Sequence, residues 1–229
     1  MSQVVWLPGT LCDERLFAPQ RAALGAGVVP DVSQFDSVTS QAHAVWQSLG
    51  PGSVKLVGLS YGGILALEMI RQQPQRVTHL AVLDSNARSD TGEKQRQRNA
   101  LIEQLIEGQF ESIVMEQLKP LYLGCKQRDN SAILNTVRDM ALSQGQAVLE
   151  RQVRAVRDRP DQRSYLPQIQ VPTLILAGQE DVLCPPDRQH EMHQMIARSQ
   201  LVLLPDCGHL STLEASEAVN QALATLFKR

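Results

Sequence analysis

The fold of this chain is decided by residues 54–63, which read VKLVGLSYGG. The first four of these residues form a mostly apolar run that is typical of a short buried strand. The next five match the pattern G-x-S-x-G, and a helical pattern follows. In this context the pattern predicts a strained strand-to-helix turn that presents the hydroxyl of Ser60 at the carboxyl end of a sheet. Gly58 and Gly62 lack the Cβ atoms that would clash in so tight a turn.

Short apolar runs alternate with amphipathic stretches on both sides of this segment. Each run is apolar at consecutive positions and too short for a helix, as in parallel strands that are buried on both faces. The runs are residues 4–7, 28–29, 54–57, 80–83, 173–176 and 201–204. Helical patterns lie at residues 64–71, 187–198 and 213–227. The alternation predicts an α/β fold with a doubly wound, mostly parallel sheet of about six strands.

The middle of the chain has a different pattern, because no strand-like run occurs between residues 88 and 163. Four helical patterns take its place, at residues 99–106, 110–123, 131–142 and 147–157. Glycines and Pro160 separate these patterns. We therefore expect an α/β core made of residues 1–87 and 164–229, with an all-helical cap of residues 88–163 inserted into it.

Two later residues are candidates to activate Ser60. A serine at neutral pH is a weak nucleophile and needs a base that is oriented by an acid. Asp181 and His209 each follow an apolar run, so they are expected at the same edge of the sheet as Ser60. The order Ser, Asp, His along the chain is the one expected for a triad on an α/β sheet. Ser60, Asp181 and His209 are therefore the candidate catalytic residues.

Other interpretations of these positions remain open. Glu180 is the alternative acid, and Asp181 is alternatively a turn residue or the cap of the helix that follows. His209 is alternatively a structural histidine. The other histidines lie on predicted helices or at the opposite end of a strand; they are His43, His79, His190 and His193.

An oxyanion hole needs two N–H donors that are held in place before the reaction. Tyr61 is the first candidate, because it follows Ser60 and opens a helix whose N-terminus favours negative charge. The second is expected from the loop after the first strand, where Gly9 would allow close backbone approach. Thr10 is the preferred donor in that loop and Leu11 is the alternative. Pro8 and Gly9 can also form a simple turn, and such a turn does not exclude an oxyanion donor in this loop.

The whole chain resembles the serine hydrolases of the α/β-hydrolase superfamily. The matching motifs are residues 58–63, residues 178–181 with Pro185, and residues 208–209 with Glu214 and Glu217 downstream. The resemblance implies that Ser60 is the nucleophile, that His209 is the general base and acid, and that Asp181 orients His209. It also implies that the helical insertion covers the site and supplies the acyl pocket. Within the superfamily the chain is similar to small carboxylesterases, including the pimeloyl-[acyl-carrier-protein] methyl ester carboxylesterase type.

Two features depart from the superfamily pattern. Many members have His-Gly where this chain has Pro8 and Gly9, so this loop must be held in another way. The first two strands of the fold also have no counterpart before residue 4. Haloalkane dehalogenases of the superfamily carry aspartate at the elbow, so Ser60 argues against that activity.

Composition excludes several other classes of function. The 229 residues include 22 basic and 24 acidic side chains, and the net charge of -2 argues against nucleic acid and membrane partners. No apolar run approaches the roughly 18 residues of a membrane span. The four cysteines are widely spaced and the histidines offer no metal-ligand pattern, so no metal or cofactor is expected. The N-terminal residues do not read as a secretory signal, and a cytoplasmic protein is expected.

These observations predict a hydrolase that cleaves a carboxylic ester of a small or medium apolar acyl group through an acyl-enzyme. The alternatives are a C–C bond hydrolase or perhydrolase with the same triad, and a ligand sensor without turnover. Cap residues are expected to line the pocket or to form the cap's own core; they are Leu101, Leu105, Ile106, Ile113, Met115, Leu118, Leu121, Tyr122 and Met140. The substrate partner is thus a small ester.

Three arginines at helical spacing allow a further partner. Arg151, Arg154 and Arg157 would lie along one face of a cap helix, where they would form either a docking stripe for an acyl-carrier protein or a solvated surface. The second interpretation is the default for such a charge pattern.

Overall fold

A single parallel sheet organises residues 2–229, the part of the chain that the computed structural model describes. Its spatial order is β1-β2-β3-β4-β5. The strands are β1 (Gln3–Leu7), β2 (Val54–Leu59), β3 (Val77–Leu83), β4 (Thr173–Gly178) and β5 (Ser199–Leu204). The predicted α/β class with a parallel sheet is therefore confirmed.

The apolar run at residues 28–29 does not form a full strand. Val28 makes one isolated parallel bridge to Val5 at the free edge of β1. The N–H of Trp6 donates to the carbonyl of Val28 at 2.8 Å, and the N–H of Val28 donates to the carbonyl of Val4 at 2.9 Å. Pro30 follows directly and has no N–H, so it cannot extend such a ladder. The described sheet thus has five strands and one bridge.

Alternate residues of each strand enter two different hydrophobic cores, one on each face of the sheet. Leu56 of β2 and Leu80 of β3 join the core that includes α2 and α3. Their neighbours Val57 and Ala81 join the core that includes α10. This two-residue period, with both faces apolar, explains why the strands read as continuous hydrophobic runs.

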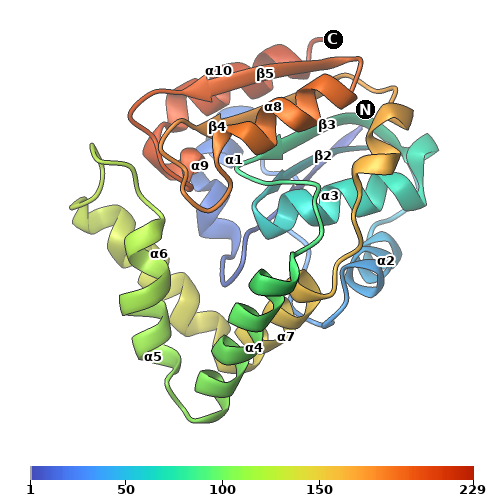
Figure 1. Cartoon of the computed structure of the whole chain (residues 1–229). Helices are drawn as coiled ribbons and strands as arrows, with labels where there is room; N and C mark the ends of the chain where they lie inside the picture. Colours follow the sequence, from blue (N-terminus) through green and yellow to red (C-terminus); the bar gives the residue numbers. More distant parts are fainter. Residues whose placement is uncertain (1) are drawn as a thin grey trace.

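Helices cover both faces of the sheet (Figure 1). The helices outside residues 88–163 are η1 (Glu14–Phe17), α1 (Ala18–Leu24), α2 (Val38–Ser48), α3 (Tyr61–Gln72), η2 (Pro74–Arg76), η5 (Arg163–Gln168), α8 (Pro186–Met195), α9 (Ser211–Glu214) and α10 (Ser216–Leu226). The helix expected over residues 213–227 is divided, because Ala215 has φ -135° and ψ 47° and interrupts it. The helix expected at 187–198 ends at Met195.

Residues 88–163 form helices and contain no strand in the described structure. They are α4 (Gly92–Ile106), α5 (Phe110–Ser112), the π-helix η3 (Ile113–Leu118), η4 (Lys119–Leu121), α6 (Ser131–Gln144) and α7 (Gln146–Arg157). Side chains of α4, η3, α6 and α7 share a hydrophobic cluster, which Leu11 of the loop after β1 joins. Figure 1 shows these helices at the carboxyl end of the strands, beside the sheet. The division of the chain into two domains at residues 88 and 163 stays a prediction.

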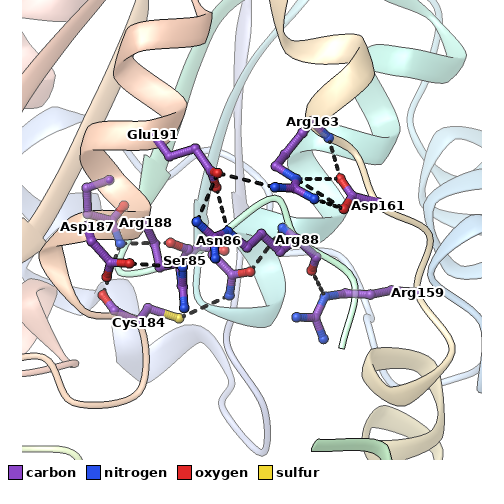
Figure 2. Close-up of polar contacts among 11 residues, drawn as sticks. Ser85, Asn86, Arg88, Arg159, Asp161, Arg163, Cys184, Asp187, Arg188 and Glu191 are labelled. Atoms are coloured by element: carbon purple, nitrogen blue, oxygen red, sulfur yellow. Dashed lines mark hydrogen bonds and ion pairs between the residues drawn. The ribbon is translucent and has the colours of Figure 1, made fainter. Parts of the chain in front are cut away.

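The two segments that enter and leave this helical region are held together by charged contacts (Figure 2). Arg88 pairs with Glu191 of α8, with its Nε 2.8 Å from the carboxylate. Arg163 reaches the same carboxylate at 3.3 Å and also pairs with Asp161. Arg159 donates from Nε to the carbonyl of Arg88 at 2.8 Å. These contacts fix the base of the helical region to the core of the protein.

Within residues 2–229, no helix has both the length and the apolar character to cross a membrane. The cytoplasmic location stays a prediction.

Candidate active site

Ser60 lies at a strained turn between β2 and α3. Its φ of 56° and ψ of -116° lie outside the regions that non-glycine residues favour. A Cβ at Gly58 would lie 2.1 Å from the carbonyl oxygen of Gly62, and one at Gly62 would lie 1.8 Å from that of Leu7. The turn therefore requires glycine at both positions, as the sequence pattern predicts.

Three residues from distant parts of the chain form one hydrogen-bonded line. Nε2 of His209 is 2.9 Å from Oγ of Ser60, and its Nδ1 is 2.8 Å from Oδ2 of Asp181. The other carboxylate oxygen of Asp181 accepts the backbone N–H groups of Leu183 and Cys184, each at 2.9 Å. These two bonds hold the carboxylate so that Oδ2 is directed at the imidazole. With Nδ1 donating to Asp181, Nε2 of the neutral ring accepts the serine proton.

The surroundings of His209 favour its charged form. Burial opposes the imidazolium, but the charge and the hydrogen bond of Asp181 outweigh burial and raise the pKa of His209 above its ordinary value of 6.5. The side chain of His209 is 4% exposed and that of Asp181 is fully buried. An imidazole in this setting can accept a proton from Ser60 and keep the resulting charge stabilised.

A second buried carboxylate, Asp84, lies beneath the line. It follows β3 directly, with φ 45°, and its Oδ1 accepts the N–H of Gly178 at 3.0 Å. Its Oδ2 accepts the hydroxyl of Ser211. Burial and the nearby charge of Asp181 raise the pKa of Asp84 well above its ordinary value. Asp84 was not among the residues expected at the site, although its place directly after an apolar run was a signal for it.

The loop that carries His209 is held by Glu214 and by the helical region. One oxygen of Glu214 accepts the N–H groups of Gly208 at 3.0 Å and Gly124 at 2.8 Å, and the other accepts that of Leu210 at 3.0 Å. The N–H of His209 donates to the carbonyl of Tyr122 at 2.7 Å. The position of the imidazole therefore depends on the segment between η4 and α6, within the helical region, as well as on the sheet.

The loop after β1 lies beside Ser60. The N–H of Leu11 donates to Oε1 of Gln152 on α7 at 2.9 Å, so the alternative oxyanion donor is already engaged. The N–H groups of Thr10 and Tyr61 make no hydrogen bond with any described residue. Gln152 is buried and far away in the chain, and nothing in the sequence pattern pointed to it.

A cavity of about 580 Å³ opens onto Ser60 and His209. Four of the nine apolar and aromatic residues expected from the cap line it, namely Leu101, Leu118, Leu121 and Tyr122. Leu105, Ile113 and Met140 are buried in hydrophobic clusters, while Ile106 and Met115 are exposed. The floor of the cavity includes Gly9, Thr10 and Tyr61. A pocket of this size suits a small-molecule substrate.

The alternative triad members lie elsewhere. Glu180 accepts the N–H of Cys125 at 2.6 Å and makes no contact with His209. His43 contacts Gln47, and His193 contacts Ser199. The structure thus brings together the three residues that the sequence analysis preferred.

Asp181, Cys184 and His209 also offer potential metal ligands within 4.8 Å of one another. Both ring nitrogens of His209 are engaged, however, by Asp181 and Ser60. Burial raises the pKa of the Cys184 thiol to about 12, so the thiolate that a metal would need is strongly disfavoured. The donor set therefore fits a proton relay better than a metal centre.

The arginine stripe of α7 makes contacts within the protein. Arg151 donates to the carbonyl of Ser33 at 2.7 Å, and Arg154 pairs with Glu150 at 2.7 Å. Arg157 pairs with Asp158 at 2.6 Å. These contacts favour the interpretation as a solvated helix face.

The strained serine turn, the Ser-His-Asp line and the covering helices define the class of protein. Residues 4–222 match the model of the alpha/beta hydrolase family, and the chain belongs to this family. It is a hydrolase.

The chain is also similar to individual named proteins. The chain is 27% identical, over 80% of its length and 74% of the relative, to the pimeloyl-[acyl-carrier protein] methyl ester esterase of Nitrosomonas europaea. It is 25% identical, over 89% of its length and 79% of the relative, to a putative non-heme bromoperoxidase of Mycobacterium tuberculosis. A malate-bound esterase from Thermogutta terrifontis superposes with a TM-score of 0.88, at 25% identity, over all of this chain and 90% of that one.

Proposed function

We propose that this hydrolase cleaves carboxylic esters of small or medium acyl groups through a covalent acyl-enzyme on Ser60. The observation that carries the proposal is the contact of Nε2 of His209 with Oγ of Ser60, at 2.9 Å, completed by Asp181 at 2.8 Å. The similarity to the esterase of Nitrosomonas europaea supports an ester as the substrate.

The reaction proceeds in two halves. His209 takes the hydroxyl proton as Ser60 attacks the ester carbonyl, and Asp181 stabilises the imidazolium that forms. His209 then gives this proton to the leaving alcohol, which departs and leaves the acyl group on Ser60. A water molecule enters, loses a proton to His209 and attacks the acyl-enzyme. As the second tetrahedral intermediate collapses, His209 returns this proton to Oγ of Ser60, so that the carboxylic acid is released and the serine and the neutral imidazole are restored.

The N–H groups of Thr10 and Tyr61 serve as the oxyanion hole. Neither is engaged by another described residue, and both residues line the cavity beside Ser60. The engagement of the Leu11 N–H by Gln152 favours Thr10 over Leu11 as the second donor. Two such donors stabilise the negative charge that develops on the carbonyl oxygen.

A burst assay with p-nitrophenyl butyrate tests the proposal. We expect an initial release of nitrophenol that is stoichiometric with enzyme, followed by slower turnover. Ser60→Ala should abolish the burst and lower kcat by about 10⁶-fold. Turnover close to that of the unchanged protein in this variant would defeat the assignment of Ser60. A sensor protein would show neither burst nor turnover.

A second candidate activity uses the same triad with peroxide in place of water. The similarity to a protein named as a bromoperoxidase is the observation that favours it. Formation of a peracid from an ester and hydrogen peroxide, faster than hydrolysis of that ester, would select this activity. Cleavage of a C–C bond is tested by incubating the same purified protein with a diketone substrate.

An acyl-carrier protein stays a proposed partner, because the esterase of Nitrosomonas europaea is named for such a substrate.

A further inference from the structure

Three cationic side chains line the cavity that contains Ser60. They are Lys94 and Arg98 of α4 and Arg159, which follows α7. Within residues 2–229, no Asp or Glu is among the residues that line this cavity. Lys94 is exposed, Arg98 is half-buried and Arg159 is buried. A hydrolase for a purely apolar acyl group has no use for these charges, and burying the charge of Arg159 is costly unless it is paired.

One carboxylate compensates part of the charge. Asp90 is buried; its Oδ1 lies 2.8 Å from Nη1 of Arg159, and its Oδ2 contacts Nε of Arg98. A single carboxylate shared by two guanidinium groups leaves one positive charge without a partner. Lys94 adds another, so these four residues carry a net charge of about +2 at neutral pH.

The guanidinium of Arg159 is held in place and incompletely satisfied. Its side chain is 4% exposed. Nε donates to the carbonyl of Arg88 at 2.8 Å, and Nη1 donates to that of Val156 at 2.7 Å. Nη2 makes no hydrogen bond with any described residue. Figure 2 shows the terminal nitrogens of Arg159 directed away from Arg88. Because Arg159 lines the cavity, the N–H donors of Nη2 are available to an oxygen of a ligand that binds there.

We infer that Arg159, Arg98 and Lys94 bind a free carboxylate at the far end of the acyl chain, so that the preferred substrates are half-esters of dicarboxylic acids. This inference rests on the proposed function. The ester lies at Ser60, the apolar middle of the chain contacts cavity residues such as Leu101 and Val153, and the distal carboxylate faces the guanidinium groups. Arginine suits this role because its planar donors match a carboxylate.

The geometry favours a small molecule over a protein surface as the source of the carboxylate. Arg159 is too deeply buried for a side chain of a docked protein to reach without entering the cavity. The cavity, with a volume of about 580 Å³, accommodates an acyl chain of several carbons. The arginines of the α7 stripe, by contrast, pair with neighbouring side chains or carbonyls.

A pair of nearly isosteric esters tests this inference. Monomethyl adipate carries the distal carboxylate, and methyl 5-carbamoylpentanoate replaces it with a neutral amide. We expect kcat/KM for the acid to exceed that for the amide by about tenfold or more, since a hydrogen bond to a charged group contributes at least this factor. Monomethyl esters of the dicarboxylic acids from succinate to suberate, each compared with its amide, identify the preferred chain length. A ratio near one or below at every length would overturn the inference.

Substitutions assign the preference to these residues. Arg98→Gln should lower the acid-to-amide ratio by about tenfold, because Asp90 keeps its contact with Arg159 while the cavity loses one charge. The double variant Asp90→Asn with Arg159→Gln should lower the acid-to-amide ratio as well. Because both partners of the buried pair are neutralised, neither charge is left buried and unpaired. Arg96→Gln is the matched control, since Arg96 lies on α4, is exposed and does not line the cavity. An equal ratio in Arg98→Gln and Arg96→Gln would contradict the assignment.

Binding without turnover separates this inference from the proposed function. Calorimetry on Ser60→Ala with monomethyl adipate should show binding that is lost when Arg98→Gln is added. If p-nitrophenyl butyrate is not hydrolysed but this binding is observed, the catalytic proposal fails and the carboxylate site stands. If p-nitrophenyl butyrate is hydrolysed through Ser60 but the acid has no advantage over the amide, only the carboxylate site fails.

Discussion

Oε1 of Gln152 accepts the backbone N–H of Leu11 at 2.9 Å, across 141 positions of sequence. The same side chain donates to the carbonyl of Val32 at 3.3 Å and is buried. Gln152 therefore ties a helix of the inserted region to the loop that carries Thr10. The loop begins with Pro8 and Gly9, and Gln152 supplies a hydrogen bond that holds it.

Replacing Gln152 should impair catalysis more than substrate binding. Gln152→Met leaves the Leu11 N–H without its acceptor and loosens the loop that presents the Thr10 N–H. We expect kcat to fall by about 10-fold to 100-fold, less than the complete loss of an oxyanion donor, with KM nearly unchanged. Steady-state kinetics with p-nitrophenyl butyrate measures this. Gln95→Met on α4 is the control, because Gln95 is exposed and its side chain donates to the Arg157 carbonyl and not to the loop after β1. Equal losses in both variants would contradict the role of Gln152.

The pH dependence of activity should follow the titration of His209. Only the neutral imidazole can take the proton of Ser60, so activity falls as the pH decreases through the pKa of His209. Because Asp181 raises this pKa, the midpoint of the acid limb of kcat/KM should lie above 6.5. Asp181→Asn should move the midpoint to lower pH and reduce kcat by about 10⁴-fold. An equal midpoint in the unchanged protein and in Asp181→Asn would show that a group other than His209 controls the fall of kcat/KM at low pH.

Adding one methyl group to the serine turn should prevent correct folding. In Gly58→Ala the new Cβ would lie 2.1 Å from a backbone oxygen that cannot move without disrupting α3. We expect a loss of soluble expression, or a free energy of unfolding lower by about 3 kcal/mol or more. Gly50→Ala is the matched control, because no atom lies within 4 Å of its new Cβ. Denaturant unfolding of both proteins measures the difference, and equal stabilities would exclude the steric argument.

Neutralising Glu214 should weaken the loop that carries His209. The carboxylate accepts three backbone N–H groups on its two oxygens, whereas Gln offers one acceptor and places an NH₂ against the remaining donors. We expect Glu214→Gln to lose about 2 kcal/mol of stability and about tenfold in kcat. Thermal unfolding and kinetics test this. Glu217→Gln, at an exposed position three residues later, should change neither quantity.

The serine turn and the triad could be predicted because each depends on short-range signals. Gly58 and Gly62 flank Ser60 at fixed spacing and are visible in the sequence, although the backbone that Gly62 approaches belongs to Leu7 of β1. Asp181 and His209 each follow a buried strand, and the carboxyl ends of parallel strands meet at one edge. Their mutual contact then follows from the topology of the sheet.

Other features could not be predicted, because they depend on contacts between segments that are distant in the sequence. Val28 pairs with Val5 through a single bridge, although its apolar run resembled the true strands. The break at Ala215 interrupts a periodic pattern that predicted one continuous helix. The π-helix at Ile113–Leu118 likewise has no distinct pattern in the sequence.

The sequence alone determined the class of fold and the three residues at the carboxyl edge of the sheet. Glycine sterics and the alternation of apolar strands with amphipathic helices are local properties, and they leave little choice of topology. Only the tertiary structure decided which backbone N–H groups remain free beside Ser60 and which charges line the cavity. Gln152 and Arg98 reach the site from the inserted helices and Arg159 from the segment after α7, and helix periodicity does not reveal what each side chain contacts. Hydrogen bonds and charge pairing are set by position in space, and spacing along the chain does not encode them.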